Sequence, residues 1–241
     1  MLKSKIIQLN ANPEGFGEVA DELEQSMFAS SLPVQHSHDD FEDEDLGLYV
    51  GVWDTTDMVE AAGPYACHEF MTVIEGSVDI KNNVTGKIET VVAGQSFVIP
   101  KDYDCQWQQT GYLRKFYVIY EPEDEQPSTE QPSGIVIISE NKAIAWQETS
   151  DGHRKKVLFS NESGTFVSGV WNTNGLETGE IQFPYNEFFT IKTGNIVCTE
   201  IVGDKTIEHE FKCGSSVFIP KDTACSWKIS TPTTLHFVQI K

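Results

Sequence analysis

The chain has few basic residues and no long apolar run, and each shortage excludes a class of partner. Its 241 residues include 17 Lys and Arg against 37 Asp and Glu, a formal net charge of −20. Such a charge repels nucleic-acid phosphates and anionic membrane surfaces, so neither is expected as a partner. No apolar segment approaches the roughly 20 residues of a membrane-spanning helix. The first residues also lack the longer apolar core of a secretion signal, so a cytoplasmic location is expected.

Paired cysteines and the motifs of common enzyme classes are also lacking. The five cysteines are an odd number and form no paired clusters. This pattern favours free thiols in a reducing compartment over a disulfide framework. The sequence contains no phosphate-binding glycine loop, no zinc-type C-x-x-C pair and no G-x-S-x-G elbow. It therefore contains no recognisable motif of a nucleotide-binding, zinc-binding or serine-hydrolase site.

The most informative feature that is present is an internal repeat. The pattern G-x-S-x-x-I-P-K-D-x-x-C-x-W occurs at residues 94–107 and again at 214–227. A G-V-W segment followed by an E-F segment precedes each copy, with nearly the same spacing. The order and spacing of these blocks indicate that one ancestral domain was duplicated.

An acidic, proline-spaced segment separates the two halves. Residues 121–134 contain no apolar side chain that could pack, so they are expected to form an extended linker. A chain of this length suits two domains of about 120 residues each. The sequence therefore predicts one domain over residues 1–120 and a second over residues 135–241.

Short strand-like segments separated by turns fill both halves. Residues 70–74 and 116–120 are β-branched and aromatic runs of strand length. The residues at 82–86 and 202–204 are typical of hairpin turns. Together with the twofold repeat, this pattern predicts an all-β protein built from two antiparallel barrels or sandwiches.

The segments outside these motifs carry weaker signals. Residues 135–138 are expected to open the second half as a strand, with residues 6–9 as their counterpart in the first. Only residues 18–29, where apolar side chains are loosely spaced, hint at a helix. His36-Ser37-His38 precedes an acidic run, which indicates either a divalent-ion site or, more commonly, a solvated acidic loop.

The repeated blocks resemble the two motifs of the cupin superfamily, G-x5-H-x-H-x(3,4)-E-x6-G and G-x5-P-x-G-x2-H-x3-N. The G-V-W, E-F and I-P-K segments are most similar to the subgroup that includes ethanolamine-utilisation proteins and lies near ureidoglycine aminohydrolase. The resemblance covers about residues 45–120 and 164–240. It implies a bicupin, with two double-stranded β-helix (jelly-roll) barrels that each hold a pocket. The matching segments are residues 69–76 and 187–194 for E-x6-G, and residues 94–100 and 214–220 for G-x5-P.

The chain departs from the family at the metal ligands. Cys105 and Cys225 replace the histidine of the second motif, so each barrel keeps only a glutamate and a thiol. Zinc or iron normally needs three or four converging ligands. No metal cofactor is therefore expected, although a divalent metal held by Glu69 and Cys105 is an alternative. The two histidines expected ahead of the glutamate fall on Ala62 and Pro64 or on Gly63 and Tyr65, and in the second half near Gln182.

Strand alternation predicts which side chains meet inside the first barrel. Cys105 and Trp107 share a face because side chains two residues apart point the same way. The motif histidine of the family faces the barrel interior, so these two side chains should as well. Glu69, Met71 and Val73 then form an inward row.

The last strand of each half distinguishes the two barrels. Lys115 and Tyr117 share a face, and their repeat partners are Leu235 and Phe237. If this face is interior, the first barrel holds an ammonium and a phenol that the second barrel lacks. Lys115 would then pair with Glu69, because a buried charge needs a partner. The alternative is a surface lysine beside the barrel rim.

The sequence supports three hypotheses about function. The leading one is that the first barrel binds a small zwitterion or carboxylate without a catalytic metal, while the second barrel is mainly structural. An enzyme of nitrogen-compound metabolism, resembling ureidoglycine aminohydrolase, would need a metal or an acid–base pair such as Glu69 with Lys115 or Tyr117. A purely structural dimer, in which the tryptophans are core, is the third, and a homodimer is expected in any case. The candidate ligand-binding residues are Glu69, Lys115, Tyr117, Trp53, Trp107 and Cys105.

Overall fold

The computed structural model describes residues 3–122, 125, 132–149 and 152–241. These residues form strands and turns, and their helical content is a single 3₁₀ turn, η1 (Gln25–Met27). The helix suggested at residues 18–29 is otherwise absent. Val19, on its proposed apolar face, is 82% exposed and therefore has nothing to pack against. Among the described residues, no helix has the length and apolar character of a membrane span.

Contacts within the chain define two compact units. The first unit contains residues 10–137, and the second contains residues 1–9 together with 138–241. Most of the expected linker, residues 121–134, lies outside the described part of the chain. The domain boundaries expected on either side of this linker stay a prediction.

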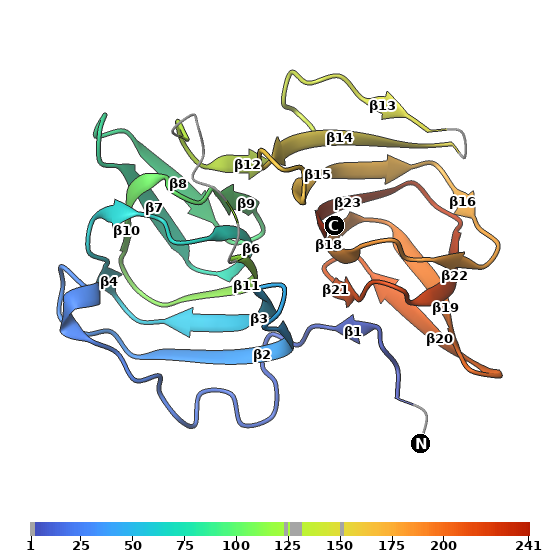
Figure 1. The fold of residues 1–241 in the computed structure, drawn as a ribbon, viewed down its shortest axis with the longest axis horizontal. Coiled ribbons are helices and arrows are strands. Elements are labelled where there is room, and N and C mark those ends of the chain that lie inside the picture. The colour runs from blue at the N-terminus through green and yellow to red at the C-terminus, as the bar shows by residue number, and fades with distance from the viewer. Residues whose placement is uncertain (1–2, 123–124, 126–131, 150–151) are drawn as a thin grey trace. The chain divides into compact units, whose positions relative to one another are not determined.

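Two sheets enclose the core of the first unit. One sheet has the order β12-β9-β6-β11-β3-β2 and the other has the order β4-β10-β7-β8, with β5 paired to β10. Met71 from the first sheet and Ile80 from the second belong to one buried cluster, so the core lies between the sheets (Figure 1). The strands are β2 (Gln35–Asp43), β3 (Leu48–Thr55), β4 (Met58–Val59), β5 (Gly63–Pro64), β6 (His68–Glu75), β7 (Ser77–Asn82), β8 (Ile88–Val92), β9 (Ser96–Ile99), β10 (Asp104–Gln109), β11 (Leu113–Tyr120) and β12 (Val136–Ile138).

The second unit repeats this architecture. Its sheets have the orders β1-β21-β18-β23-β15-β14-β13 and β16-β22-β19-β20, with β17 paired to β22. Phe189 and Trp227, one from each sheet, share its buried cluster. The strands are β1 (Ile7–Gln8), β13 (Gln147–Glu148), β14 (His153–Ser160), β15 (Phe166–Thr173), β16 (Leu176–Glu177), β17 (Ile181–Gln182), β18 (Asn186–Thr193), β19 (Asn195–Val202), β20 (Lys205–Lys212), β21 (Ser216–Ile219), β22 (Ala224–Ile229) and β23 (Thr233–Ile240).

The opening strands belong to the opposite halves from those expected. β12 lies beside β9 in the first unit, although residues 135–138 were expected to open the second half. β1 pairs with β21 of the second unit, with Ile7 opposite Phe218 (Figure 1). The edges of β9 and β21 carry backbone groups that need partners, and either flanking segment can supply them. The sequence pattern alone does not choose between them.

The repeated motif has the same backbone geometry in both units. Asp102 and Asp222 occupy the position where the second cupin motif has glycine, and both have positive φ, at 65° and 62°. Aspartate adopts this left-handed conformation more readily than most residues. Each aspartate follows the Ile-Pro end of a strand and turns the chain into the strand that carries the motif cysteine and tryptophan. The duplication is therefore visible in the backbone as well as in the sequence.

Candidate functional site

The first unit contains a cavity of about 580 Å³. Its wall includes side chains from both sheets and from the segment between β4 and β6. All six candidate residues named from the sequence lie on this wall, although their role in ligand binding stays a prediction. They are Trp53, Glu69, Cys105, Trp107, Lys115 and Tyr117.

Strand register brings these side chains together. In β11, Lys115 lies opposite Trp53 of β3 on one side and opposite Val73 of β6 on the other. The alternating burial of β10 turns Cys105 and Trp107 inward, as the period of two predicts. The inward faces of these four strands, three from one sheet and β10 from the other, thus line the cavity.

A buried ion pair lies in the cavity wall. Lys115 Nζ donates to Glu69 Oε1 at 2.6 Å, and both residues are more than nine-tenths buried. Lys115 Nζ also contacts Met71 Sδ at 3.2 Å, and the Tyr65 hydroxyl donates to Glu69 Oε2. The pairing expected between Lys115 and Glu69 is therefore present. Each charge has the partner that burial demands.

Two tryptophans enclose the ammonium of Lys115. Its Nζ lies 4.8 Å from the ring centroid of Trp53 and 4.9 Å from that of Trp107. The two rings meet edge to face, with centroids 6.0 Å apart. Trp107 Nε1 donates to Gln109 Oε1 at 3.1 Å, which holds its ring in place. The rings therefore supply cation–π contacts to the lysine and a flat apolar wall to the cavity.

The donors at this position do not fit a metal ion. Glu69, the one retained family ligand, already binds Lys115 and Tyr65. Burial raises the pKa of the Cys105 thiol to about 12, with Glu60 and Asp104 adding to the effect, and only the thiolate is a good ligand. In the part of the chain that the structure describes, no group of three His, Cys, Asp or Glu residues could hold a metal ion.

Further polar residues that were not among the sequence candidates also line the cavity, and three of them have informative electrostatics or hydrogen bonds. Burial raises the pKa of Glu60 to about 7; Lys115 opposes this rise, while the Glu69 charge adds to it. Tyr117 donates to Asp39 Oδ1 at 2.6 Å, and burial with that bond raises its own pKa. Tyr65 is the third of these residues, and its hydroxyl donates to Glu69 Oε2. Glu60 and Asp39 lie outside the family motifs, so no motif signal marks them; Tyr65 appeared only as a lost histidine position.

The acidic segment after His36 is a strand and not the expected solvated loop. It forms β2, which pairs with β3 along its length, so alternate side chains face the cavity and solvent. His36 Nδ1 contacts Asp54 Oδ1 at 2.7 Å, whereas His38 Nε2 lies 3.7 Å from Asp40 Oδ1. The two histidines therefore have separate carboxylate partners.

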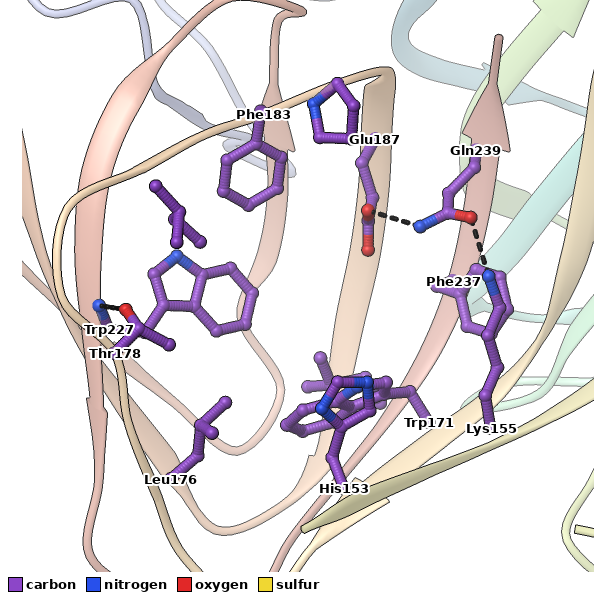
Figure 2. A pocket seen from close by; sticks show the side chains of 13 residues that line it. His153, Lys155, Trp171, Leu176, Thr178, Phe183, Glu187, Trp227, Phe237 and Gln239 are labelled. Atoms are coloured by element: carbon purple, nitrogen blue, oxygen red, sulfur yellow. Dashed lines mark hydrogen bonds between the residues drawn. The ribbon is translucent and has the colours of Figure 1, made fainter. Parts of the chain in front are cut away.

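The second unit contains a smaller cavity, of about 260 Å³ (Figure 2). Leu235 and Phe237, the repeat partners of Lys115 and Tyr117, line it as expected. The expectation that this barrel lacks an ammonium was wrong, however, because Lys155 of β14 reaches the cavity. The prediction rested on the last strand of each half alone, whereas this lysine lies on β14.

Lys155 and the repeated glutamate are joined through an amide. Lys155 Nζ donates to Gln239 Oε1 at 2.6 Å, and Gln239 Nε2 donates to Glu187 Oε2 at 2.7 Å (Figure 2). Burial lowers the pKa of Lys155 and raises that of Glu187, while the opposite charge and the Gln239 bond partly compensate. The second barrel therefore holds a bridged pair where the first holds a direct one.

Solved structures with the same fold are numerous, and the three that follow are distant in sequence. A protein of unknown function of the DUF861 family from Pseudomonas syringae pv. tomato is 18% identical over 97% of this chain and 98% of its own, with a TM-score of 0.74. A cupin 2 conserved barrel domain protein from Leptotrichia buccalis is 11% identical over 88% and 90%, with a TM-score of 0.61. HEPD from Streptomyces albus, solved with 2-hydroxyethylphosphonate and Fe(II) bound, is 8% identical over 97% and 78%, with a TM-score of 0.57.

These likenesses show the fold, and the sequence shows the family. No curated protein sequence matches the chain. The EutQ-like cupin domain matches it twice, over residues 43–117 and 160–237, which together exceed half of its length. The expected all-β bicupin architecture is thereby confirmed. The chain belongs to the EutQ-like cupin family, with one cupin domain in each half.

Proposed function

We propose that the first barrel binds a small zwitterionic metabolite without a metal ion. The observation that carries this proposal is the Lys115–Glu69 pair, which lies on the wall of a large cavity between two tryptophans. An ammonium has three donors, of which Glu69 uses one, so Lys115 retains capacity for a ligand carboxylate.

The opposite end of the ligand has partners as well. Glu60 and Asp39 line the same cavity and offer carboxylates to a ligand ammonium. Trp53 and Trp107 would cover the apolar part of the ligand between its charges. Net negative charge near the cavity favours a ligand that brings a cation, and a zwitterion satisfies both Lys115 and the carboxylates.

The test is calorimetric titration of the full chain, in buffer containing EDTA, with small amino acids, hydroxy acids and amines. Amino acids are expected to bind, and Lys115→Met to weaken binding about tenfold or more, since hydrogen bonds to charged groups contribute about 1.5–3 kcal/mol. Arg114→Met is the matched control, because it removes the same charge from the neighbouring residue, which alternates to the other face of β11. Equal affinity in both variants, or no binding of any compound, would contradict the proposal; the latter favours a structural dimer.

A second candidate function is acid–base catalysis on the bound molecule. The observation that favours it is the pKa of Glu60, which burial raises to about 7, close to the optimum for a general acid or base. Bound compounds would be followed by NMR for turnover between pH 5 and 9. An acid–base enzyme should show a rate that changes near pH 7 and is lost in Glu60→Gln. Intact compounds after prolonged incubation would leave binding alone as the function.

A further inference from the structure

We propose that the second barrel is a separate binding site for a neutral small molecule that carries a primary carboxamide on a flat apolar body. The site is the cavity shown in Figure 2, where the labelled side chains of β14, β15, β18, β22 and β23 surround a common space. It does not depend on the function proposed for the first barrel, because the two cavities share no residue.

The first argument is the position of the lysine. Lys115 of the first barrel corresponds to Leu235, so that ammonium was lost or never gained in the second half. Lys155 lies opposite Trp171, just as Ser37 lies opposite Trp53, so Ser37 is its structural counterpart. Both barrels therefore contain an inward lysine near the repeated glutamate, supplied by different strands. Lys155 is half-buried and lines the cavity, whereas lysines are mostly exposed, and a purely structural core gives no reason to place one there.

The second argument is the hydrogen bonding of Gln239. Its side-chain amide accepts from Lys155 and donates to Glu187, which are 2.6 Å and 2.7 Å away respectively. A primary amide is the group whose adjacent oxygen and nitrogen match an ammonium beside a carboxylate. Gln239 uses one of the three donors of Lys155 and one oxygen of Glu187, so both groups can bind a second amide. The barrel thus already contains an example of the group that its charges recognise.

The third argument is the balance of charge and the shape of the walls. Lys155 and Glu187 carry opposite charges, so a neutral ligand leaves neither uncompensated, whereas a carboxylate would be repelled by Glu187. Trp171 and Trp227 meet edge to face with centroids 6.3 Å apart, and Phe183 lies 5.6 Å from Trp227. These rings form an apolar wall suited to a flat hydrocarbon body.

The experiment uses benzamide as the probe and the indole N–H signals of the five tryptophans as reporters. The full chain, labelled with ¹⁵N, is titrated with benzamide, benzoate and toluene in separate NMR experiments. Single Trp→Phe variants assign the indole signals before any ligand is added. Benzamide is expected to shift the signals of Trp171 and Trp227, and benzoate and toluene to bind about tenfold more weakly, since each loses a hydrogen bond to a charged group.

Variants then separate this site from the first barrel. Lys155→Met and Glu187→Gln should each weaken benzamide binding about tenfold. Arg154→Met is the matched control, because it removes the same charge from the exposed face of β14 and should leave the affinity unchanged. Glutamine has nearly the same shape as glutamate, so Glu187→Gln is expected to stay folded. If circular dichroism shows Lys155→Met to be unfolded, the benzamide affinity of Glu187→Gln tests the proposal.

Four results would overturn the proposal. The first is the absence of any shift of Trp171 or Trp227 up to the solubility limit of benzamide. The second is equal affinity in Glu187→Gln, Arg154→Met and the unchanged protein. The third is tighter binding of benzoate than of benzamide, which would assign the cavity to anions. Shifts of Trp53 and Trp107 alone would place benzamide in the first barrel and also count against it.

Discussion

Lys115 is the residue on which the first cavity depends most. Its ammonium contacts Glu69, Met71 and two tryptophan rings, all on inward faces of the barrel. A buried ion pair adds little stability compared with an apolar pair of the same size, but loss of one partner leaves an uncompensated charge. The pair is therefore costly to break. Because an apolar pair would stabilise the fold equally well, the presence of two charges supports a role in binding more than a role in folding.

Replacement of Lys115 by methionine should lower the free energy of unfolding by about 3–5 kcal/mol, because Glu69 is left buried without its counter-charge. The double variant Lys115→Met/Glu69→Gln should recover much of this loss. Urea denaturation measures both. Leu235→Met, at the repeat-equivalent position, is the control and should cost less than about 1.5 kcal/mol. A loss in Lys115→Met no larger than in this control would show that Glu69 is not effectively buried.

At the scale of elements, the repeated glycine of the G-V-W segment permits close contact between strands. A Cβ atom at Gly51 would lie 2.0 Å from the carbonyl oxygen of His38 and 2.7 Å from the hydroxyl of Tyr117. Gly169 has the same relation to the carbonyl oxygen of Lys156, at 2.0 Å. The glycine in each repeat thus allows the outer strand to cross its neighbour closely.

Gly51→Ala should therefore push β2 away from β3 and lower the free energy of unfolding by about 1–3 kcal/mol, the usual cost of overpacking. The bond between Tyr117 and Asp39 should weaken at the same time. Thermal denaturation measures the first effect, and the ultraviolet titration of tyrosine measures the second. Gly63→Ala is the control, because nothing lies within 4 Å of its added methyl group. Equal melting temperatures for the two variants would refute this role of Gly51.

One buried carboxylate adds to the pairing of β1 with β21 in holding the N-terminal segment on the second unit. Glu200 accepts hydrogen bonds from Ser4 Oγ at 2.6 Å and from the backbone N–H of Lys5 at 2.7 Å, and His209 Nε2 lies 3.0 Å away. Burial alone would raise the pKa of Glu200, but these hydrogen bonds outweigh it and hold the pKa below its usual value. The carboxylate therefore holds the segment in place while it is ionised.

This attachment should be lost in acid. Because the folded pKa of Glu200 lies below the unfolded value of about 4.3, its contribution is complete above that pH and disappears as pH falls through the folded pKa. At neutral pH, Glu200→Gln should speed hydrogen exchange of the β1 amides about tenfold, the effect of a loss near 1.4 kcal/mol. Glu208→Gln, at an exposed site on β20, is the control. Unchanged exchange in Glu200→Gln would show that the strand pairing alone retains β1.

At the scale of the whole molecule, one fold carries two different interiors. The backbone turns at Asp102 and Asp222 are equivalent, and both barrels keep the glutamate and the cysteine of the motif. The cavities nevertheless differ in volume, in the strand that supplies the lysine and in the contact between lysine and glutamate. Duplication preserved the strands while the inward side chains diverged, which is the general relation between fold and function.

Among the described residues, neither interior offers the donors of a structural metal site, and this leads to a prediction for the whole chain. Prolonged incubation with EDTA should leave the melting temperature within about 1 °C, because a ligand that binds only the folded state stabilises it and its removal would lower that temperature. Calorimetry measures the transition with and without the chelator. Readdition of zinc to the treated sample is the control. A melting temperature that falls after EDTA treatment and recovers with zinc would reveal a metal site and contradict this prediction.

The sequence was sufficient for those features of the site that depend on strand alternation. Alternation placed Cys105 with Trp107, and Lys115 with Tyr117, on shared faces, because the period of two is a local property of each strand. The family resemblance indicated that Cys105 faces inward, whereas Lys115 was left between the interior and the barrel rim. The places of Glu60 and Asp39 in the cavity wall could not be predicted, because they depend on an isolated bridge and on the path of an outer strand. Lys155 was missed because only the last strands of the two halves were compared, and Lys155 lies on β14.

The amino-acid sequence by itself determined the duplication, the all-β architecture and which side chains share a face of the central strands, since repeated motifs and alternation are encoded within short segments. Only the tertiary structure decided which sheet edges β1 and β12 occupy and which charges meet in each cavity. Those choices depend on backbone groups and side chains far apart in the chain, whose partners are selected together when the barrels close.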